Sequence, residues 1–323
     1  MPRKLATLYL APGYRLTKPQ PISLQLLTLS NIMHIFVNFK SQLRCFLAAG
    51  LLAVISFQSI AQNTLRISAI PDESPTELQR KFKPLGDYLS KETGLKVEFT
   101  PVTDYAAVVE ALASKKIDMA WLGGFTYVQA KIRTNGSVVP IIQRVEDEKF
   151  TSIFIVPSTS SLKDLKELKG KTIAFGSPSS TSGHLMPRYF LMQAGLNVDK
   201  DFKNVAFSGA HDATVAFVAS GKAEVGVLNA SVWEKLNESK NPNALKSKVL
   251  AVTPPYFDYN WTVRGDLEPA LIKKITDAFL KLDANNPAYK ELMDLQRASK
   301  YITTKPSNYD DIEKAARSAG LIN

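Results

Sequence analysis

The first pattern in the chain is an alternation of short apolar segments with longer amphipathic ones. Residues 65–70 predict a strand, and residues 75–91 predict a helix that begins at Pro75 after Ser74, a typical start signal. Further strands are predicted at 96–99 and 117–122, and further helices at 105–113 and 125–133. Strands that alternate with helices indicate an α/β fold built on parallel sheets.

The same order of elements recurs 106 positions later. Residues 113–122 (ASKKIDMAWL) fall on 219–228 (ASGKAEVGVL), and the strand pair Arg66-Ile67 falls on Thr172-Ile173. One offset that holds across several landmarks without a gap predicts two tandem lobes of one architecture, although any two βαβ units can align by chance. At this offset Tyr105 coincides with His211, each in the first turn of a predicted helix. Since ligands of open α/β sheets bind beyond the carboxyl ends of the strands, both side chains are expected at a shared cleft.

The stretch between the strand ending at Phe175 and the next helix is rich in small hydroxyl residues. Gly176 and Gly183 flank Ser180, Thr181 and Ser182. The hydroxyls and the free backbone N–H groups of such a helix start suit an anion. An ordinary Ser/Thr helix cap is the alternative.

Composition describes a globular chain whose formal charge is misleading. The 323 residues are 45% apolar and 22% charged, with a net charge of +10. Residues 1–61 hold six Lys or Arg and no acid, so their removal reduces the charge to +4 and ends any argument for a nucleic-acid partner.

Residues 1–61 also predict a secretory leader. Lys40 and Arg44 precede the apolar run 45–57, and Ser59-Ile-Ala61 offers small residues for cleavage before Gln62. We expect residues 1–32 to be upstream sequence from a wrong start codon, because Met33 would open a signal peptide of normal length. The only cysteine, Cys45, lies in this leader, so neither disulfides nor thiol chemistry is expected afterwards. With three histidines in the whole chain, neither a metal site nor a cofactor is expected.

The lobes are predicted to be discontinuous in sequence. We assign 62–156 together with 255–323 to lobe 1 and 157–254 to lobe 2, with crossings near 156 and 254 acting as a hinge. The C-terminal helices expected at 269–283, 287–295 and 309–319 would return to lobe 1.

Four segments carry a resemblance to a known family, namely 104–112, 118–128, 180–183 with Pro187, and 209–214. In these segments the sequence resembles the periplasmic solute-binding proteins of phosphonate/phosphite ABC transporters. The resemblance implies a two-lobed periplasmic binding protein fold (type II-like). Each lobe would be a mostly parallel sheet flanked by helices, with the ligand in the interlobe cleft. It also implies a monomer in the periplasm that delivers a small tetrahedral oxyanion to a membrane permease.

The resemblance assigns roles to individual residues. It places oxyanion binding on Ser180, Thr181 and Ser182. It gives oxygen contacts to His211, Tyr105 and Tyr127, and puts Asp258 on the far side of the pocket. The alternatives are core aromatics for the two tyrosines, a helix cap for His211 and a loop cap for Asp258. Trp121 ends a buried strand on the cleft side, as a pocket wall or as core. His211, at a helix start, is expected to be a neutral imidazole because the helix dipole disfavours its charge, and His184 is expected to face outward.

Two departures bear on the ligand. Family members that take aminoalkyl phosphonates carry a carboxylate shortly after the strand that here ends at Leu228, but this chain has Asn229. Without that carboxylate, a ligand ammonium would lose its counter-charge. The aromatic stretch 253–261 resembles a branch labelled as selenate-binding. Phosphonate, phosphite, phosphate, selenate and selenite all stay open.

Two other functions fit part of the pattern. Ser182, His211 and either Asp212 or Asp258 supply the residue types of a secreted serine hydrolase, although no Gly-x-Ser-x-Gly elbow is present. A sensory binding protein that docks on a receptor is the second alternative.

Overall fold

The first of two β-sheets contains six strands. The computed structural model describes residues 64–323, so the predictions for the leader at 1–61 lie outside the described residues. The strand order is β11-β4-β10-β3-β1-β2. The bounds are β1 Thr64–Ala69, β2 Lys96–Phe99, β3 Met119–Leu122, β4 Val138–Arg144, β10 Asn260–Arg264 and β11 Tyr301–Thr303.

The second sheet contains five strands in the order β7-β6-β8-β5-β9. Their bounds are β5 Ser152–Pro157, β6 Thr172–Phe175, β7 Asn204–Phe207, β8 Val225–Asn229 and β9 Ser247–Val252. The central strands β5, β6 and β8 are almost wholly buried, because helices cover both faces of the sheet.

The internal repeat predicted from the sequence is confirmed. Helix α3 spans Tyr105–Ala113, and α7 spans His211–Ala219, 106 positions later. Strand register repeats as well, since Ile67 pairs with Met119 and Ile173 pairs with Val225. Tyr105 and His211 therefore occupy equivalent positions at the first turn of equivalent helices.

Most strands of each sheet run in one direction, as expected. Neighbouring strands pair in parallel within the βαβ repeat, namely β2-β1-β3 and β7-β6-β8. Strand β10 is antiparallel to β3, and β5 is antiparallel to β8. These strands directly adjoin the crossings between the sheets, so each enters its sheet from the opposite end. Both sheets are therefore mixed.

The first boundary between the lobes lies a few residues before the predicted residue 156. Strand β5 pairs with β8 and β9, so the second sheet already begins at Ser152. The first crossing is the segment 145–151, and the second is 253–259. The two crossings are bonded to each other, because Phe150 and Tyr256 exchange both backbone hydrogen bonds at 2.9 Å. A β-branched apolar run such as 152–157 fits either sheet, and only its pairing decides between them.

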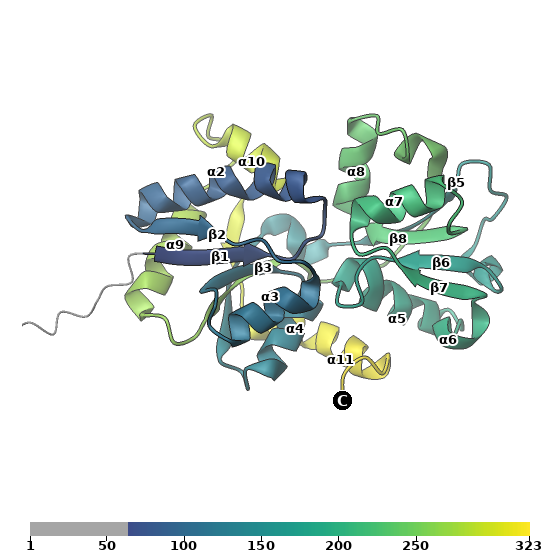
Figure 1. Ribbon diagram of the computed structural model, residues 1–323, viewed down its shortest axis with the longest axis horizontal. Helices are drawn as coiled ribbons and strands as arrows, with labels where there is room; N and C mark the ends of the chain where they lie inside the picture. The colour runs from purple at the N-terminus through teal and green to yellow at the C-terminus, as the bar shows by residue number, and fades with distance from the viewer. Residues whose placement is uncertain (1–63) are drawn as a thin grey trace, which may run out of the picture. The chain divides into compact units, whose positions relative to one another are not determined.

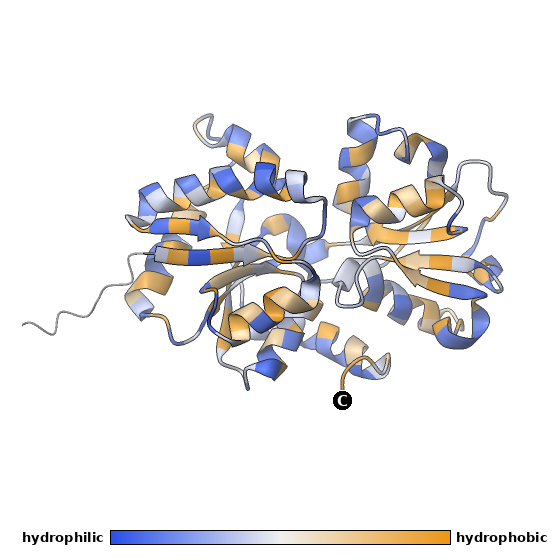
Figure 2. Cartoon of the chain, viewed as in Figure 1, coloured by the Kyte–Doolittle hydropathy of each residue, from blue (hydrophilic) through white to orange (hydrophobic). Residues whose placement is uncertain are grey.

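Helices cover the sheets on both faces (Figure 1). Helix α2 (Pro75–Thr93) lies on one face of β1 to β3, and α3 and α4 (Gly124–Arg133) lie on the other. Around the second sheet lie α5 (Met186–Gln193), α6 (Val198–Asp201), α7 and α8 (Ala230–Glu238). Helix α2 is mostly hydrophilic in composition, whereas β6 and β8 are mostly hydrophobic (Figure 2). No helix within residues 64–323 has the length and apolar character needed to cross a bilayer.

The C-terminal helices return to the first sheet, as predicted. They are α9 (Pro269–Leu280), α10 (Lys290–Gln296) and α11 (Asp310–Ser318). The Tyr88 hydroxyl on α2 donates to the Ala278 carbonyl on α9 at 2.7 Å. Buried residues of all three helices belong to the core of the first sheet.

Candidate functional site

The Ser-Thr-Ser segment forms the helix start predicted for it. A π-helical turn, Thr181–Leu185, leads directly into α5. The Ser180 hydroxyl caps this turn by accepting the Gly183 N–H at 2.9 Å. Gly183 is required here, since a Cβ would lie 2.9 Å from Ser180 Oγ and 3.0 Å from His211 Cε1. The absent side chain therefore lets the turn approach the imidazole closely.

The same turn contacts the first sheet's side of the molecule. Thr181 Oγ1 accepts the N–H of Phe125, at the start of α4, at 3.0 Å. The adjacent Gly124 N–H donates to Asp258 Oδ1 at 3.1 Å. A Cβ on Gly123 would lie 2.7 Å from Thr181 Oγ1, so this glycine permits the approach. The double glycine that follows β3 thus joins Thr181 and Asp258 across the two sheets.

Three buried polar atoms in this region have no hydrogen-bond partner in the described part of the chain. They are the Tyr105 hydroxyl, the Ser182 hydroxyl and Asp258 Oδ2. Burial raises the pKa of Tyr105 well above its usual value, and the charges of Asp72 and Asp258 add to the shift. Burial raises the pKa of Asp258 to about 7, against hydrogen bonding from Thr181 and Gly124. Unmatched buried polar atoms are costly, and they mark a place where a bound group would restore hydrogen bonds.

His211 joins the two sheets through both its backbone and its ring. Its N–H donates to the Asp72 carbonyl at 2.9 Å, and its Nδ1 accepts the Asn229 N–H at 3.4 Å. Its Nε2 lies 3.4 Å from the Tyr259 hydroxyl. Burial lowers the pKa of His211 to about 3, and the positive charge of Lys81 contributes. The imidazole is therefore neutral, as the sequence suggested, but burial rather than the helix dipole is the main cause.

The prediction that His184 faces outward is wrong. Its side chain is buried, and Nδ1 lies 2.7 Å from the Pro178 carbonyl. The ring packs edge-on against Phe175 and Phe207. The π-helical turn shifts the register of side chains relative to a regular α-helix, which the sequence pattern did not anticipate.

Trp121 is a wall of a neighbouring cavity. Its indole stacks on Tyr259 at 4.2 Å between centroids, and the Lys81 ammonium lies 3.7 Å above the same ring. Together with Asp72 and Asn229, these residues line a cavity of about 130 Å³. Trp121 therefore lines a cavity next to the site rather than belonging to the cluster of polar side chains around Ser182.

Tyr127 is not brought to this group. Its ring packs 4.9 Å from that of Tyr309, which precedes α11. Burial raises the pKa of Tyr127 to about 12, and the acidic residues that add to the shift are Asp310 and Glu313 of α11. Gly123 faces Thr181, whereas Gly124 faces Tyr309 and Ile312. Tyr127, three residues after Gly124, lies on the same side of α4 as Gly124.

Sequence reasoning missed Asp72 and Tyr259. Asp72 follows the carboxyl end of β1, and Tyr259 immediately precedes β10. The Tyr259 hydroxyl accepts the Asn229 side-chain N–H at 2.8 Å and lies 3.4 Å from Asp72 Oδ2. The position of Asp72 after the carboxyl end of the first strand is a signal that the sequence contains. The aromatic stretch around Tyr259 is another, but nothing in its pattern indicates which ring faces the cleft.

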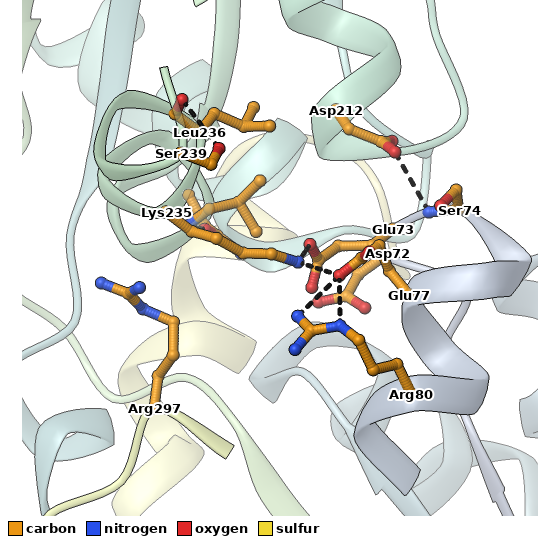
Figure 3. Close-up of polar contacts among 12 residues, drawn as sticks. Asp72, Glu73, Ser74, Glu77, Arg80, Asp212, Lys235, Leu236, Ser239 and Arg297 are labelled. Carbon is orange, nitrogen blue, oxygen red and sulfur yellow. Dashed lines mark hydrogen bonds and ion pairs between the residues drawn. The ribbon is translucent and has the colours of Figure 1, made fainter. Parts of the chain in front are cut away.

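Ion pairs and hydrogen bonds also join helices α7 and α8 to α2 and to the residues just before it (Figure 3). Lys235, from α8, reaches Glu73 and, at 2.6 Å, Glu77 of α2. Asp212 of α7 accepts the N–H of Ser74 at 3.1 Å. These contacts form only when the two lobes are together, so they favour the closed arrangement.

The hydrolase alternative lacks its central contact. Ser182 Oγ has no hydrogen-bond partner in residues 64–323, and the ring nitrogens of His211 face Asn229 and Tyr259. A nucleophile activated by histidine requires a hydrogen bond between the two. The arrangement is that of a binding site.

Comparisons with known proteins agree. The family model described as "ABC transporter, phosphonate, periplasmic substrate-binding protein" matches residues 67–309. The chain is 38% identical over 271 residues to the probable ABC transporter phosphite binding protein PhnD1 of Prochlorococcus marinus, covering 80% of this chain and 90% of that protein. It is 30% identical over 245 residues to the phosphate-import protein PhnD of Mycolicibacterium smegmatis, covering 71% and 74%.

A solved structure supports the same conclusion. The structure of P. marinus PhnD1 in complex with methylphosphonate superposes with a TM-score of 0.76 at 36% identity, over 81% of this chain and all of that one. The members of this family are substrate-binding proteins rather than enzymes. The chain belongs to the periplasmic substrate-binding proteins of phosphonate-type ABC transporters.

Proposed function

We propose that this protein captures a small tetrahedral oxyanion of the phosphonate, phosphite or phosphate class between its two lobes and delivers it to the permease of an ABC importer. The main support for this proposal is a cluster of buried polar atoms without hydrogen-bond partners among the described residues. They belong to Tyr105, Ser182 and Asp258 and lie next to the neutral imidazole of His211. These four polar groups come from two sheets. Without a ligand they contribute little to stability, whereas together they can bind one small anion.

In the proposed site, several neutral hydrogen-bond donors hold the oxyanion. The Ser182 and Tyr105 hydroxyls and the N–H groups at the start of the Thr181–Leu185 turn donate to the oxyanion. Ser180 and Thr181 hold that turn in place through their bonds to Gly183 and Phe125. The neutral ring of His211 also contacts the oxyanion. Trp121, which stacks on Tyr259, forms a wall of the pocket.

Asp258 has a role that an ionised carboxylate could not fill. Its pKa of about 7 keeps a large protonated fraction at neutral pH. A protonated carboxyl can donate to an anion, whereas a carboxylate would repel it. The anion can also bring the proton itself, since a phosphonate monoanion carries one acidic proton and a phosphate monoanion carries two.

Closure follows from the bonds between the lobes. The crossings 145–151 and 253–259 are the hinge, and the Phe125–Thr181 bond is made only in the closed form. The binding energy of the oxyanion with the Tyr105 and Ser182 hydroxyls then raises the population of the closed form, which a permease recognises. We further propose that residues 1–61 are removed on export, and that the protein acts as a monomer.

Calorimetric titration of the purified protein with methylphosphonate, phosphite and phosphate tests this function. At least one anion should bind with 1:1 stoichiometry, and Ser182→Ala should weaken it roughly tenfold or more, as expected for a lost hydrogen bond to a charged group. The exposed Ser220 serves as the matched control, and Ser220→Ala should leave affinity unchanged. Absence of binding to all three, or hydrolysis of a phosphate ester that depends on Ser182, would overturn the proposal.

A further inference from the structure

The cavity of about 130 Å³ beside the proposed oxyanion group is lined by an unusual number of charged side chains. Its cations include Lys81, Arg144 and Lys235. Arg144 forms a bidentate pair with Asp147, and Lys235 pairs with Glu73 and Glu77. Lys81 is different, because no described carboxylate lies within 4.0 Å of its ammonium.

Lys81 is buried, and its ammonium has no hydrogen-bond acceptor among residues 64–323. The residue is only 8% exposed, and its ammonium lies 3.7 Å from the centroid of Trp121 and 5.3 Å from that of Phe82. Cation–π contact replaces only part of the lost hydration of an ammonium. A polar acceptor placed in the cavity would supply what these rings cannot.

Asp72 is the complementary group. Its carboxylate is buried, with Oδ1 unmatched in the described chain and Oδ2 at 3.4 Å from the Tyr259 hydroxyl. Asp72 also lies beside the proposed oxyanion group, since its carbonyl accepts the His211 N–H at 2.9 Å. The cavity therefore adjoins the proposed oxyanion group at Asp72 and Tyr259, and Lys81 is part of its lining.

We infer that this cavity holds the carbon substituent of the phosphonate, and that the substituent bears an uncharged hydroxyl that accepts from Lys81 and donates to Asp72. The inference rests on the proposed function and specifies its substrate class. A hydroxyl is both donor and acceptor, so it matches both groups at once.

The charges in the cavity exclude the two obvious competitors. A carboxylate substituent would add a negative charge beside Asp72, and an ammonium would add a positive charge beside Lys81. Either would pair with one of these two groups but would also bury its charge next to the like charge of the other, which is unfavourable. The hydroxyl leaves the balance between Lys81 and Asp72 undisturbed. The Trp121 face is then available to the apolar carbons of the substituent.

Calorimetry with a set of matched phosphonates tests the inference. The set is methylphosphonate, ethylphosphonate, 2-hydroxyethylphosphonate, 2-aminoethylphosphonate and phosphonoacetate. The wild type should bind the hydroxyethyl compound roughly tenfold or more tighter than ethylphosphonate, and tighter than both charged analogues. Lys81→Met should remove most of this preference while methylphosphonate affinity changes little.

Lys83→Met is the matched control, because Lys83 lies on the same helix, is exposed and pairs with Asp87. It should leave every affinity unchanged. If Lys81→Met does not fold, Asp72→Asn and the wild-type ranking decide, since the hydroxyl preference must be present in the unaltered protein.

The outcomes separate the two proposals. If methylphosphonate binds but the hydroxyl gives no advantage, or a charged analogue binds best, the inference is overturned and the proposed function stands. A hydroxyl preference that survives Lys81→Met also overturns it. If no phosphonate binds at all, the proposed function fails and this inference fails with it.

Discussion

The Phe125 N–H donates to Thr181 Oγ1 at 3.0 Å, and so joins the first turn of a helix on one sheet to the hydroxyl-rich turn of the other. Thr181→Val keeps the shape of the side chain but removes the acceptor, which leaves the Phe125 N–H unmatched in the closed form alone. Closing then costs about 1–3 kcal/mol more, and oxyanion affinity should fall roughly tenfold. Titration calorimetry measures the change. Thr181→Ser keeps the hydroxyl and should retain affinity, and a Thr181→Val protein of wild-type affinity would show that this bond does not contribute to closure.

Tyr105 and Tyr127 offer a comparison of two buried tyrosines with different neighbours. The Tyr105 hydroxyl has no hydrogen-bond partner among the described residues, and the nearby charges of Asp72 and Asp258 add to the rise in its pKa. The Tyr127 ring instead packs on Tyr309. Tyr105→Phe should weaken oxyanion binding by roughly tenfold. Tyr127→Phe makes the same chemical change and should alter binding by less than about twofold. Equal losses in the two variants would place Tyr127 in the binding group after all.

The pH dependence of stability provides a test of Asp258. Burial raises its pKa from 3.8 to about 7, so the folded state favours the protonated carboxyl. The wild type therefore loses stability relative to Asp258→Asn as pH rises from about 4 to about 7, and the difference is constant above that. Its full size is up to about 4 kcal/mol, and Asn can still accept the Gly124 N–H.

Thermal unfolding without ligand between pH 4 and 8.5 measures this difference. Asp87→Asn, at an exposed helix position, is the control and should run parallel to the wild type. A constant difference between Asp258→Asn and the wild type over the whole range would contradict a buried, protonated Asp258.

The two described histidines should both stay neutral well below their ordinary pKa. Burial lowers the pKa of His211 to about 3 and that of His184 to about 4. Both depressed values make the folded state less stable as pH falls from about 6.5 toward these values, because the unfolded chain binds protons first. In proton NMR spectra of the folded protein, the ring signals of both should be constant from pH 8 to pH 5. A midpoint near 6.5 for either would show an exposed ring.

The repeat made much of the fold predictable from sequence. A single offset carried the strand order, the helix starts and the equivalence of Tyr105 and His211, because two copies of a βαβ unit repeat their local signals together. The placement of β5 and the mixed direction of the sheets were not predictable in this way. They depend on which strands pair across the crossings, and the local pattern of 152–157 suits either sheet.

The site was predictable only where a residue type and a helix start coincided. Ser180, Thr181 and Ser182 stood out because three hydroxyls exceed what one cap uses. The role of Tyr127 could not be decided from sequence, because a motif does not tell which side of a helix meets the other lobe, and one residue separates the two sides at Gly123 and Gly124. Asp72 and Tyr259 come together from 187 positions apart, through a contact that no local pattern contains.

A crystal structure of the protein with methylphosphonate tests the central claim most directly. The phosphonate oxygens should lie within about 3.2 Å of Ser182 Oγ and the Tyr105 hydroxyl, next to Asp258, with the Phe125–Thr181 bond intact. A phosphonate bound away from these atoms, or no phosphonate between the lobes at saturating concentration, would contradict the account.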